Sequence, residues 1–273
     1  MTINCRGKLI DFQTPKVMGI LNITPDSFFD GGKYNNEKDI LLQTEKMLED
    51  GATFIDIGAY SSRPGAAHVS EDEELQRIVP VVTLLSKKFP EAFISIDTFR
   101  SNIAKETILA GGAIVNDISG GNLDKNMFKT IAELQVPYIL MHMQGTPQNM
   151  QQNPNYENIT TELISFFAEK LFELHQLKVN DVIIDVGFGF GKTIAHNYEL
   201  LQDLSLFENL DSPILAGVSR KSMLYKLLDT SPQEALNATS IANTIALLNG
   251  ANILRVHDVK EAVEAVKIVS QVR

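Results

Sequence analysis

The sequence is poor in cysteine, tryptophan and positive charge. Its 273 residues include one cysteine and no tryptophan, and 34 Asp and Glu stand against 24 Lys and Arg, for a net charge of −10. A single cysteine, Cys5, excludes an internal disulfide and a cysteine-rich metal site, so nothing in the composition asks for an oxidising compartment. The acidic excess argues against nucleic-acid or anionic-membrane partners, because phosphate contacts need a basic face.

Long apolar runs are missing as well. No stretch reaches the roughly 18 apolar residues that a membrane-spanning helix needs. The first residues, MTINCRGKLIDFQ, lack the basic start and the apolar core of a signal peptide. We therefore expect a cytoplasmic protein. If it binds a small anion, its basic side chains must be concentrated at one site.

Eight short apolar runs are present, and most of them end in a polar residue or glycine. They are rich in β-branched residues and almost continuously apolar, which is typical of strands buried on both faces of a parallel sheet. The runs are VMGILN (17–22), TFIDIG (53–58), FISID (93–97), AIVND (113–117), YILMH (138–142), VIIDVG (182–187), ILAGVS (214–219) and ILRVH (253–257).

Segments with helical periodicity lie between these runs. Several begin with a residue that commonly caps a helix, and Pro80 falls inside one pattern, where it should kink the helix. The helical segments and start signals are residues 37–50, Ser70 with Glu73, 156–174, Ser231 with Pro232, and Asp258 with Glu261.

Eight strands that are each followed by a helix predict a (β/α)₈ TIM barrel. The alternative is a doubly wound open sheet, which would gather its ligand residues at one switch point rather than at most strand ends. We expect a single domain over residues 1–273, with residues 1–13 forming a hairpin that closes the bottom of the barrel.

Polar residues collect at the ends of the predicted strands, where barrel enzymes carry their active sites. A buried charge there costs several kcal/mol unless it is paired. One such residue is usually structural, but the repetition over most strands favours a ligand site. These residues are Asn22, Asp56, Asp97, Asn116, Asp117, Met141, His142, Asp185, the segment 219–222, Arg255 and His257.

Charge divides these residues into two groups. Arg63, Lys221, Arg255 and His257 suit a phosphate-type anion. A separate group rich in hydrogen-bond acceptors suits a flat heterocycle with several N–H donors, such as a pterin or guanine edge, because a carboxylate binds such an edge in a bidentate way. The acceptor group consists of Asp97, Asn116 and Asp185.

The segment GFGFGKT (187–193) resembles a phosphate-binding loop without matching one. The first glycine of the P-loop pattern would fall on Val186, and Lys192 takes the last glycine of the dinucleotide pattern. We interpret the segment as a turn that exposes Phe188 and Phe190. The five histidines are scattered, and His142 is expected to be a satisfied strand-end residue rather than a metal ligand.

Eight motifs together resemble the dihydropteroate synthase family. They are MGILNITPDSFFDGG (18–32), IDIGAYSSRPGA (55–66), SIDTFR (95–100), VNDISGG (115–121), YILMHMQGTP (138–147), IIDVGFGFGKT (183–193), GVSRKSM (217–223) and ILRVHDV (253–259). The resemblance covers nearly the whole chain. It implies a homodimeric TIM-barrel transferase that joins 6-hydroxymethyl-7,8-dihydropterin diphosphate to 4-aminobenzoate, giving 7,8-dihydropteroate and diphosphate.

The resemblance also implies roles for individual residues. Asn22 would help to hold Mg²⁺, the implied cofactor, which is shared with the diphosphate. The pterin would contact Asp97, Asn116, Asp185 and Lys221, with Met141 and Gly217 lining its pocket. The diphosphate would contact Ser62, Arg63, Arg255 and His257. The aminobenzoate would lie among Pro64, Phe190, Lys221 and Ser222, with its carboxylate near the helix start at Ser222.

One position departs from the family pattern. Tyr60 stands where the family commonly has Glu, which puts any role of that acid in doubt. Arg220 is left without a role in the site, apart from a structural pairing. Two other functions remain open, a pterin-dependent methyltransferase and a non-catalytic pterin-binding paralogue. The first has no need of the segments around Arg63 and Lys221, and the second should have lost such residues.

Overall fold

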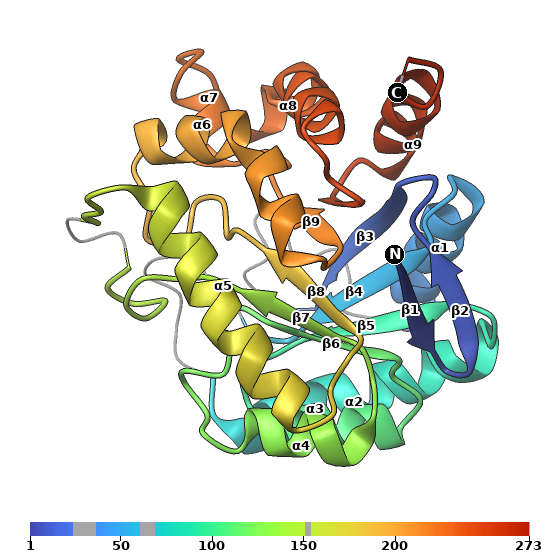
Figure 1. The fold of residues 1–273 in the computed structure, drawn as a ribbon. Coiled ribbons are helices and arrows are strands. Elements are labelled where there is room, and N and C mark those ends of the chain that lie inside the picture. Colours follow the sequence, from blue (N-terminus) through green and yellow to red (C-terminus); the bar gives the residue numbers. More distant parts are fainter. Residues whose placement is uncertain (24–36, 61–68, 151–153, 273) are drawn as a thin grey trace.

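The computed structural model describes residues 1–23, 37–60, 69–150 and 154–272. Strands β3 to β10 form a closed parallel barrel in the order β10-β3-β4-β5-β6-β7-β8-β9, with the helices outside it (Figure 1). The barrel closes because β10 pairs with both β3 and β9. This confirms the predicted (β/α)₈ fold and excludes the open sheet.

The elements follow one another as strand and helix along the chain. The strands are β1 Thr2–Cys5, β2 Lys8–Asp11, β3 Lys16–Asn22, β4 Phe54–Gly58, β5 Phe93–Asp97, β6 Ile114–Asp117, β7 Tyr138–Met141, β8 Val182–Asp185, β9 Ile214–Ala216 and β10 Ile253–Val256. The α-helices are α1 Glu37–Glu49, α2 Glu71–Lys88, α3 Ser101–Leu109, α4 Met127–Leu134, α5 Ile159–Gln176, α6 Ile194–Gln202, α7 Ser222–Tyr225, α8 Leu236–Leu248 and α9 Val259–Val269, and the 3₁₀ segments are η1 Leu204–Leu210 and η2 Pro232–Glu234.

The strand side chains alternate between the barrel interior and the helical layer. Outward-facing Ile55, Val115 and Ile184 belong to the large core that the helices cover. Inward-facing residues change character within a single strand, because Phe54 near the start of β4 is apolar whereas Asp56, two residues later, is a buried carboxylate. The barrel interior is therefore apolar at the N-terminal end of the strands and polar at the C-terminal end.

The predicted hairpin is present as the antiparallel pair β1 and β2. Ile3, Cys5 and Ile10 of the hairpin, with Phe12 after it, pack in one cluster with the first inward-facing residues of the barrel strands. The hairpin thus closes the N-terminal end of the barrel. Burial raises the pKa of the Cys5 thiol to about 12, so this thiol stays protonated at neutral pH.

The helix start signals are confirmed in part. Ser70 caps α2 by accepting a hydrogen bond from Glu73 N, whereas the Glu73 carboxylate pairs with Arg77 instead of completing the capping box. Helix α2 runs through Pro80 without ending. Ser231 and Glu234 form a capping box, but the helix they begin is the short η2, which leads into α8.

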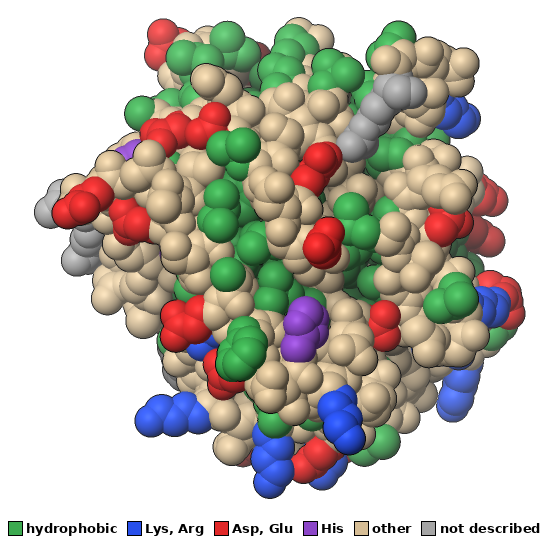
Figure 2. Space-filling model, in the orientation of Figure 1, with side chains coloured by type: hydrophobic (Ala, Val, Ile, Leu, Met, Phe, Trp, Pro, Cys, Tyr) green, Lys and Arg blue, Asp and Glu red, His purple; other side chains and the backbone are tan. Residues whose placement is uncertain are grey.

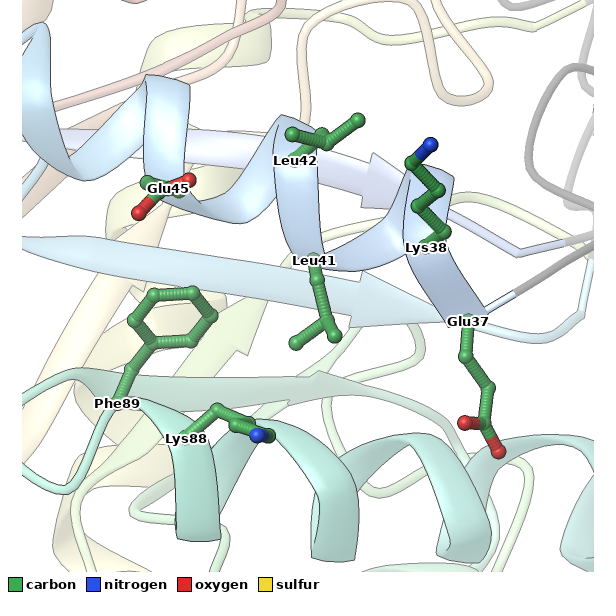
Figure 3. A pocket seen from close by; sticks show the side chains of 7 residues that line it. All are labelled: Glu37, Lys38, Leu41, Leu42, Glu45, Lys88 and Phe89. Carbon is green, nitrogen blue, oxygen red and sulfur yellow. The ribbon is translucent and has the colours of Figure 1, made fainter.

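The outer surface shows where the excess acidic charge lies. On the face drawn in Figure 2, Asp and Glu side chains are scattered rather than gathered in one patch. Within the described part of the chain, no helix combines the length and apolarity that crossing a membrane requires. A groove between α1 and the end of α2 is lined by Leu41, Leu42 and Phe89 with charged neighbours, and it contains none of the strand-end residues (Figure 3).

Candidate active site

The inward-facing side chains at the C-terminal end of the strands form a charged cluster. Strand register explains why these side chains meet, since Asp56 of β4 pairs with Ser95 of β5, and Asp97 pairs with Asn116 of β6. Those on the strands lie two residues beyond an inward-facing apolar residue of the same strand, or four residues beyond it in the case of Asp97. We call this cluster the barrel mouth; its members are Asp56, Asp97, Asn116, Asp185, Gly217 and Arg255, with Lys221 from the loop after β9.

Arg255 connects the two groups that the sequence suggested were separate. Its Nε donates to Asp56 Oδ2 at 2.6 Å, and its Nη2 donates to Asp97 Oδ2 at 2.7 Å. The expectation of an anion group set apart from the acceptor group is therefore wrong for this residue. Arg255 and Asp97 each keep about a fifth of their side-chain surface exposed (19% and 20%), so both can be reached from the barrel mouth.

Asp56 was noted as a strand-end residue but received no role from the sequence. Its Oδ2 accepts hydrogen bonds from both Arg255 Nε and Asn116 Nδ2, the latter at 3.0 Å, and its side chain is fully buried. Asp56 Oδ1 has no hydrogen-bond partner among the described residues. The signal that identifies it is strand parity, because it lies two residues after the inward-facing Phe54.

Lys221, Asp185 and Gly217 meet beside Arg255 in the barrel mouth, because β9 is the direct neighbour of β10. Lys221 Nζ donates to the carbonyl oxygen of Phe188, and Asp185 Oδ1 accepts from Gly187 N at 2.8 Å. A Cβ added to Gly217 would lie 3.9 Å from Lys221 Nζ and 4.0 Å from Asp185 Oδ2. A side chain at this position would therefore project into the space between the ammonium and the carboxylate.

Burial shifts the pKa values of several of these groups toward neutral pH. It raises the pKa of Asp97 to about 7 against the opposing effect of Arg255, and it raises the pKa of Asp185 against that of Lys221. Burial lowers the pKa of Lys221 to about 8, while Asp185 opposes the shift. Burial also acts to lower the pKa of Arg255, but Asp56 and Asp97 outweigh it and raise that pKa. Such shifts are common in ligand and catalytic sites.

An apolar cluster adjoins the charged residues. Met141 at the end of β7 is buried in it, and Phe190 from the loop after β8 packs half-buried against it. The ring of Phe190 lies 4.7 Å from Lys221 Nζ. We call this group the methionine cluster; its members are Ile118, Met141, Met143 and Met150, with Phe99 and Phe190 against them.

The expectation that Phe188 is exposed is wrong. Phe188 is fully buried in the large core, whereas Phe190 lies at the barrel mouth. The intervening Gly189 has a φ of +80°, and Gly187 before them has a φ of +69°. These left-handed positions turn the backbone, so that successive aromatic rings enter different environments.

Residues after β9 and β10 complete one side of the barrel mouth. Ser219 Oγ lies 3.1 Å from His257 Nδ1 and accepts from His257 N at 3.2 Å. Ser219 therefore contacts both the backbone and the ring of His257. Ser222 begins α7, as predicted, but this helix has only four residues. Its dipole is accordingly a weaker source of anion binding than a long helix would provide.

Arg220 has the structural pairing that the sequence left open. Its Nε and Nη2 donate to the two carboxylate oxygens of Asp258, both at 2.8 Å, and its Nη1 donates to the carbonyls of Pro232 and Gln233. Asp258 is the N-cap residue of α9, so the helix starts where the sequence predicted, but the Asp258 side chain makes no capping hydrogen bond. The carboxylate is held by a bidentate guanidinium instead.

Tyr60, at the position of the missing acid, lies against aromatic and cationic neighbours. Its ring makes an edge contact with Phe99 at 5.0 Å between centroids, and Arg100 Cζ lies 5.4 Å from the Tyr60 centroid. Gln148 Nε2 donates to Tyr60 Oη at 3.1 Å. Arg100 also pairs with the buried Glu74, so a carboxylate near this guanidinium is supplied by another residue.

The remaining predicted residues are placed only in part. Asn22 ends β3 and is half-buried at the C-terminal end of the barrel. His142 is a satisfied strand-end residue, as predicted, because its Nδ1 lies 3.2 Å from Lys192 Nζ. Ser62, Arg63 and Pro64 lie outside the described residues.

Comparison with known proteins agrees with this geometry. The family model described as "Pterin binding enzyme" matches residues 18–257. Dihydropteroate synthase of Escherichia coli is 43% identical over 271 residues, which cover 98% of this chain and 95% of that protein. The chain belongs to the pterin binding enzyme family, and within it to the dihydropteroate synthases.

Solved structures of dihydropteroate synthases have the same fold. The Yersinia pestis enzyme, solved as a sulfonamide drug complex, is 44% identical with a TM-score of 0.96 and covers 100% of this chain and 99% of its own. The Xanthomonas albilineans enzyme, solved with 4-aminobenzoic acid, is 34% identical with a TM-score of 0.91 and covers 99% and 97%. This chain is accordingly a transferase of folate biosynthesis.

Proposed function

We propose that the barrel mouth joins 6-hydroxymethyl-7,8-dihydropterin diphosphate to 4-aminobenzoate, with release of diphosphate. The observation that carries this assignment of the site is the Arg255 guanidinium, which faces the acidic pocket of Asp56 and Asp97 at the open end of the barrel. A site in which carboxylate and amide acceptors lie next to a guanidinium and an ammonium suits a substrate that is a heterocycle at one end and a polyanion at the other. Family membership supports the same reaction.

The pterin would occupy the acidic side of the barrel mouth. Asp97, Asn116 and Asp185 would accept hydrogen bonds from the amino and ring N–H groups, and Lys221 would donate to the ring acceptors. Gly217 leaves room beside Lys221 and Asp185, since a Cβ there would lie 3.9 Å from Lys221 Nζ. Met141 would cover the ring from the methionine cluster.

The diphosphate would lie toward Arg255, His257, Ser62 and Arg63. Asn22 suits Mg²⁺ in its donor chemistry, because Mg²⁺ prefers oxygen ligands and commonly combines one or two protein oxygens with substrate phosphates. As the family resemblance implies, Asn22 would share the ion with the diphosphate. When bound, the ion would supply positive charge to the departing diphosphate.

The 4-aminobenzoate would lie between Phe190, Lys221, Ser222 and Pro64. The contact between Lys221 Nζ and the Phe190 ring supports this placement, because it joins an apolar surface to a cation that can attract the carboxylate. A 44% identical relative was solved as a sulfonamide drug complex, and we expect sulfonamides to compete with 4-aminobenzoate in this chain.

The reaction we propose is a dissociative displacement. The C9–O bond of the pterin substrate breaks first, and the diphosphate leaves with the electron pair. Asp97 and Asp185 offset the positive charge that the ring and its methylene carbon then carry, while Arg255 and His257 stabilise the anion. The neutral amine of 4-aminobenzoate attacks the carbon and afterwards loses a proton. This route needs no covalent enzyme intermediate.

The test of the proposed function is diphosphate release from the pterin diphosphate in the presence and absence of 4-aminobenzoate. We expect release that depends on the amine and yields an equal amount of 7,8-dihydropteroate. The absence of both products would refute the proposal. Exchange of the bridging oxygen into nonbridging positions of unreacted substrate would report the ionisation step separately.

We also propose a homodimer, a cytoplasmic location and a single catalytic domain over residues 1–273. Apolar side chains exposed on α8 and α9, among them Ile241, Ile245, Leu248 and Ile268, support a dimer surface there. Sedimentation at micromolar concentration would reveal the dimer, and I241E should weaken it if this face is buried between protomers.

A further inference from the structure

Phe190 lies in the loop between β8 and α6, and its backbone carbonyl is hydrogen-bonded within that loop. Its glycines 187, 189 and 191 all have positive φ, at +69°, +80° and +61°. A Cβ at Gly187 would lie 2.1 Å from the carbonyl oxygen of His142, and one at Gly191 would lie 2.8 Å from that of Gln144. The loop therefore packs directly on the backbone that follows β7, with no room for larger residues.

Lys192 joins these two segments from a buried position. Its Nζ donates to the carbonyl oxygen of Phe190 at 3.0 Å and to that of His142 at 3.2 Å, and it lies 3.2 Å from His142 Nδ1. The side chain has only 3% of its surface exposed. A buried ammonium is costly unless it is fully hydrogen-bonded. These three contacts therefore offset the cost of burying Lys192 Nζ.

The titration of the two side chains agrees with this arrangement. Burial lowers the pKa of Lys192 to about 7, opposed by Asp185, and burial together with Lys192 lowers the pKa of His142 to about 3. His142 is therefore neutral at physiological pH, and its Nδ1 can accept from the lysine. Both protonation states of Lys192 retain N–H donors for the Phe190 carbonyl.

Other side chains hold neighbouring parts of the loop. Lys221 donates to the carbonyl of Phe188, Asn197 Oδ1 accepts from Gly189 N at 2.6 Å, and Tyr156 Oη donates to the carbonyl of Gly191 at 2.8 Å. Lys192 differs from these because its contact is to the residue whose ring packs on the methionine cluster and faces Lys221.

We propose that Lys192 is a positioning residue for the aromatic amine substrate, fixing the Phe190 carbonyl so that the Phe190 ring is held in place for 4-aminobenzoate. The inference rests on the proposed function, which gives Phe190 that role. Lys192 itself contacts only protein atoms in this account. Its loss should therefore affect the amine more than the pterin.

The experiment compares K192M with Y156F, its matched control. Met has a similar length and no charge, whereas Y156F removes a hydrogen bond to the next carbonyl of the same loop. We expect K192M to raise the KM for 4-aminobenzoate about tenfold and Y156F less than twofold, with the KM for the pterin diphosphate within about twofold in both. K192Q, which keeps an amide NH2 group as donor, should recover part of the loss.

Equal changes in both KM values, or equal effects of K192M and Y156F, would overturn the positioning role. If K192M does not fold, the same split is measured on K192Q. A second readout is independent of turnover: in protein labelled with ¹³C on phenylalanine rings, K192M should shift the Phe190 signal, assigned by its loss in F190L, and Y156F should not. An unmoved signal refutes the role. No turnover by the unaltered chain would refute the proposed function alone, since the ring signal still tests the position of Phe190.

Discussion

The two ends of the barrel interior differ although only two residues separate them along β4, β6, β8 and β10. At the N-terminal end the inward-facing side chains are apolar and pack against the β1–β2 hairpin. At the C-terminal end they are carboxylates, an amide and a guanidinium. The pairs are Phe54 and Asp56, Ile114 and Asn116, Ile183 and Asp185, and Ile253 and Arg255.

This difference separates stability from chemistry within one scaffold. Burying the apolar residues contributes about 25 cal/mol per Å² of apolar surface removed from water. Burying the charged residues is unfavourable unless each is paired, and even paired charges add little to stability. We infer that the hairpin end specifies the fold, and that the charged end is retained for the ligands. Variants that affect one end only can test this separation.

The largest expected effect follows from the loss of Lys221. K221A removes the cation that faces Asp185 and the Phe190 ring, so binding of both substrates should suffer. We expect kcat/KM to fall by about a thousandfold or more for each substrate, because the group would contact both of them. Steady-state kinetics provides the measurement. Near-normal kcat and KM for both substrates would remove Lys221 from the site.

A smaller effect should distinguish two arginines that both form buried ion pairs. R255M leaves Asp56 and Asp97 without their cation, and we expect about a hundredfold loss of kcat/KM with a stability loss of about 3–5 kcal/mol. R220M breaks the Asp258 pair outside the barrel mouth. It should lower stability comparably while the folded fraction keeps its kcat/KM.

Urea unfolding and kinetics on the same samples separate these outcomes. Loss of activity by R220M beyond its unfolded fraction would contradict the distinction between the two ion pairs. Retention of full activity by R255M would contradict the role of Arg255 in the barrel mouth.

The last expected effect concerns pH and stability rather than catalysis. Lys192 has its pKa lowered to about 7 in the folded state, whereas an unfolded lysine titrates near about 10.4. Between these values the unfolded state binds more protons, so the free energy of unfolding should gain from this group as pH rises from about 7 to about 10. K192M lacks the group. The unfolding free energy of the unaltered chain minus that of K192M should therefore increase over this range. A constant difference would contradict the burial of a charged lysine.

The sequence predicted the strands and the hairpin because both follow from local apolar runs. Each predicted strand overlaps an observed one, although the runs ending at His142, Gly187, Ser219 and His257 include residues beyond β7, β8, β9 and β10. Parity along each strand would have separated Asp56 from Ile55 and Ile57, which face the helical layer. That signal was present in the sequence, and Asp56 still received no role.

Pairings between distant residues could not be predicted from local patterns. Arg220 pairs with the Asp258 carboxylate across 38 positions, and Arg255 reaches Asp56 across 199 positions. Phe188 entered the core because the left-handed glycines on either side of it redirected the backbone. The two ion pairs thus depend on tertiary contacts, whereas the position of Phe188 depends on the conformation of the neighbouring glycines.

The most direct test of the separation between the two ends uses adjacent inward-facing residues of β8. Kinetics and urea unfolding are measured on I183A and D185N. We predict that I183A loses about 2–5 kcal/mol of stability and keeps kcat/KM within about threefold, because it only opens a cavity at the hairpin end. D185N should keep its unfolding midpoint and lose at least about a hundredfold in kcat/KM, because it removes the charge beside Lys221. An equally deep catalytic loss in I183A, or full activity in D185N, would contradict the account.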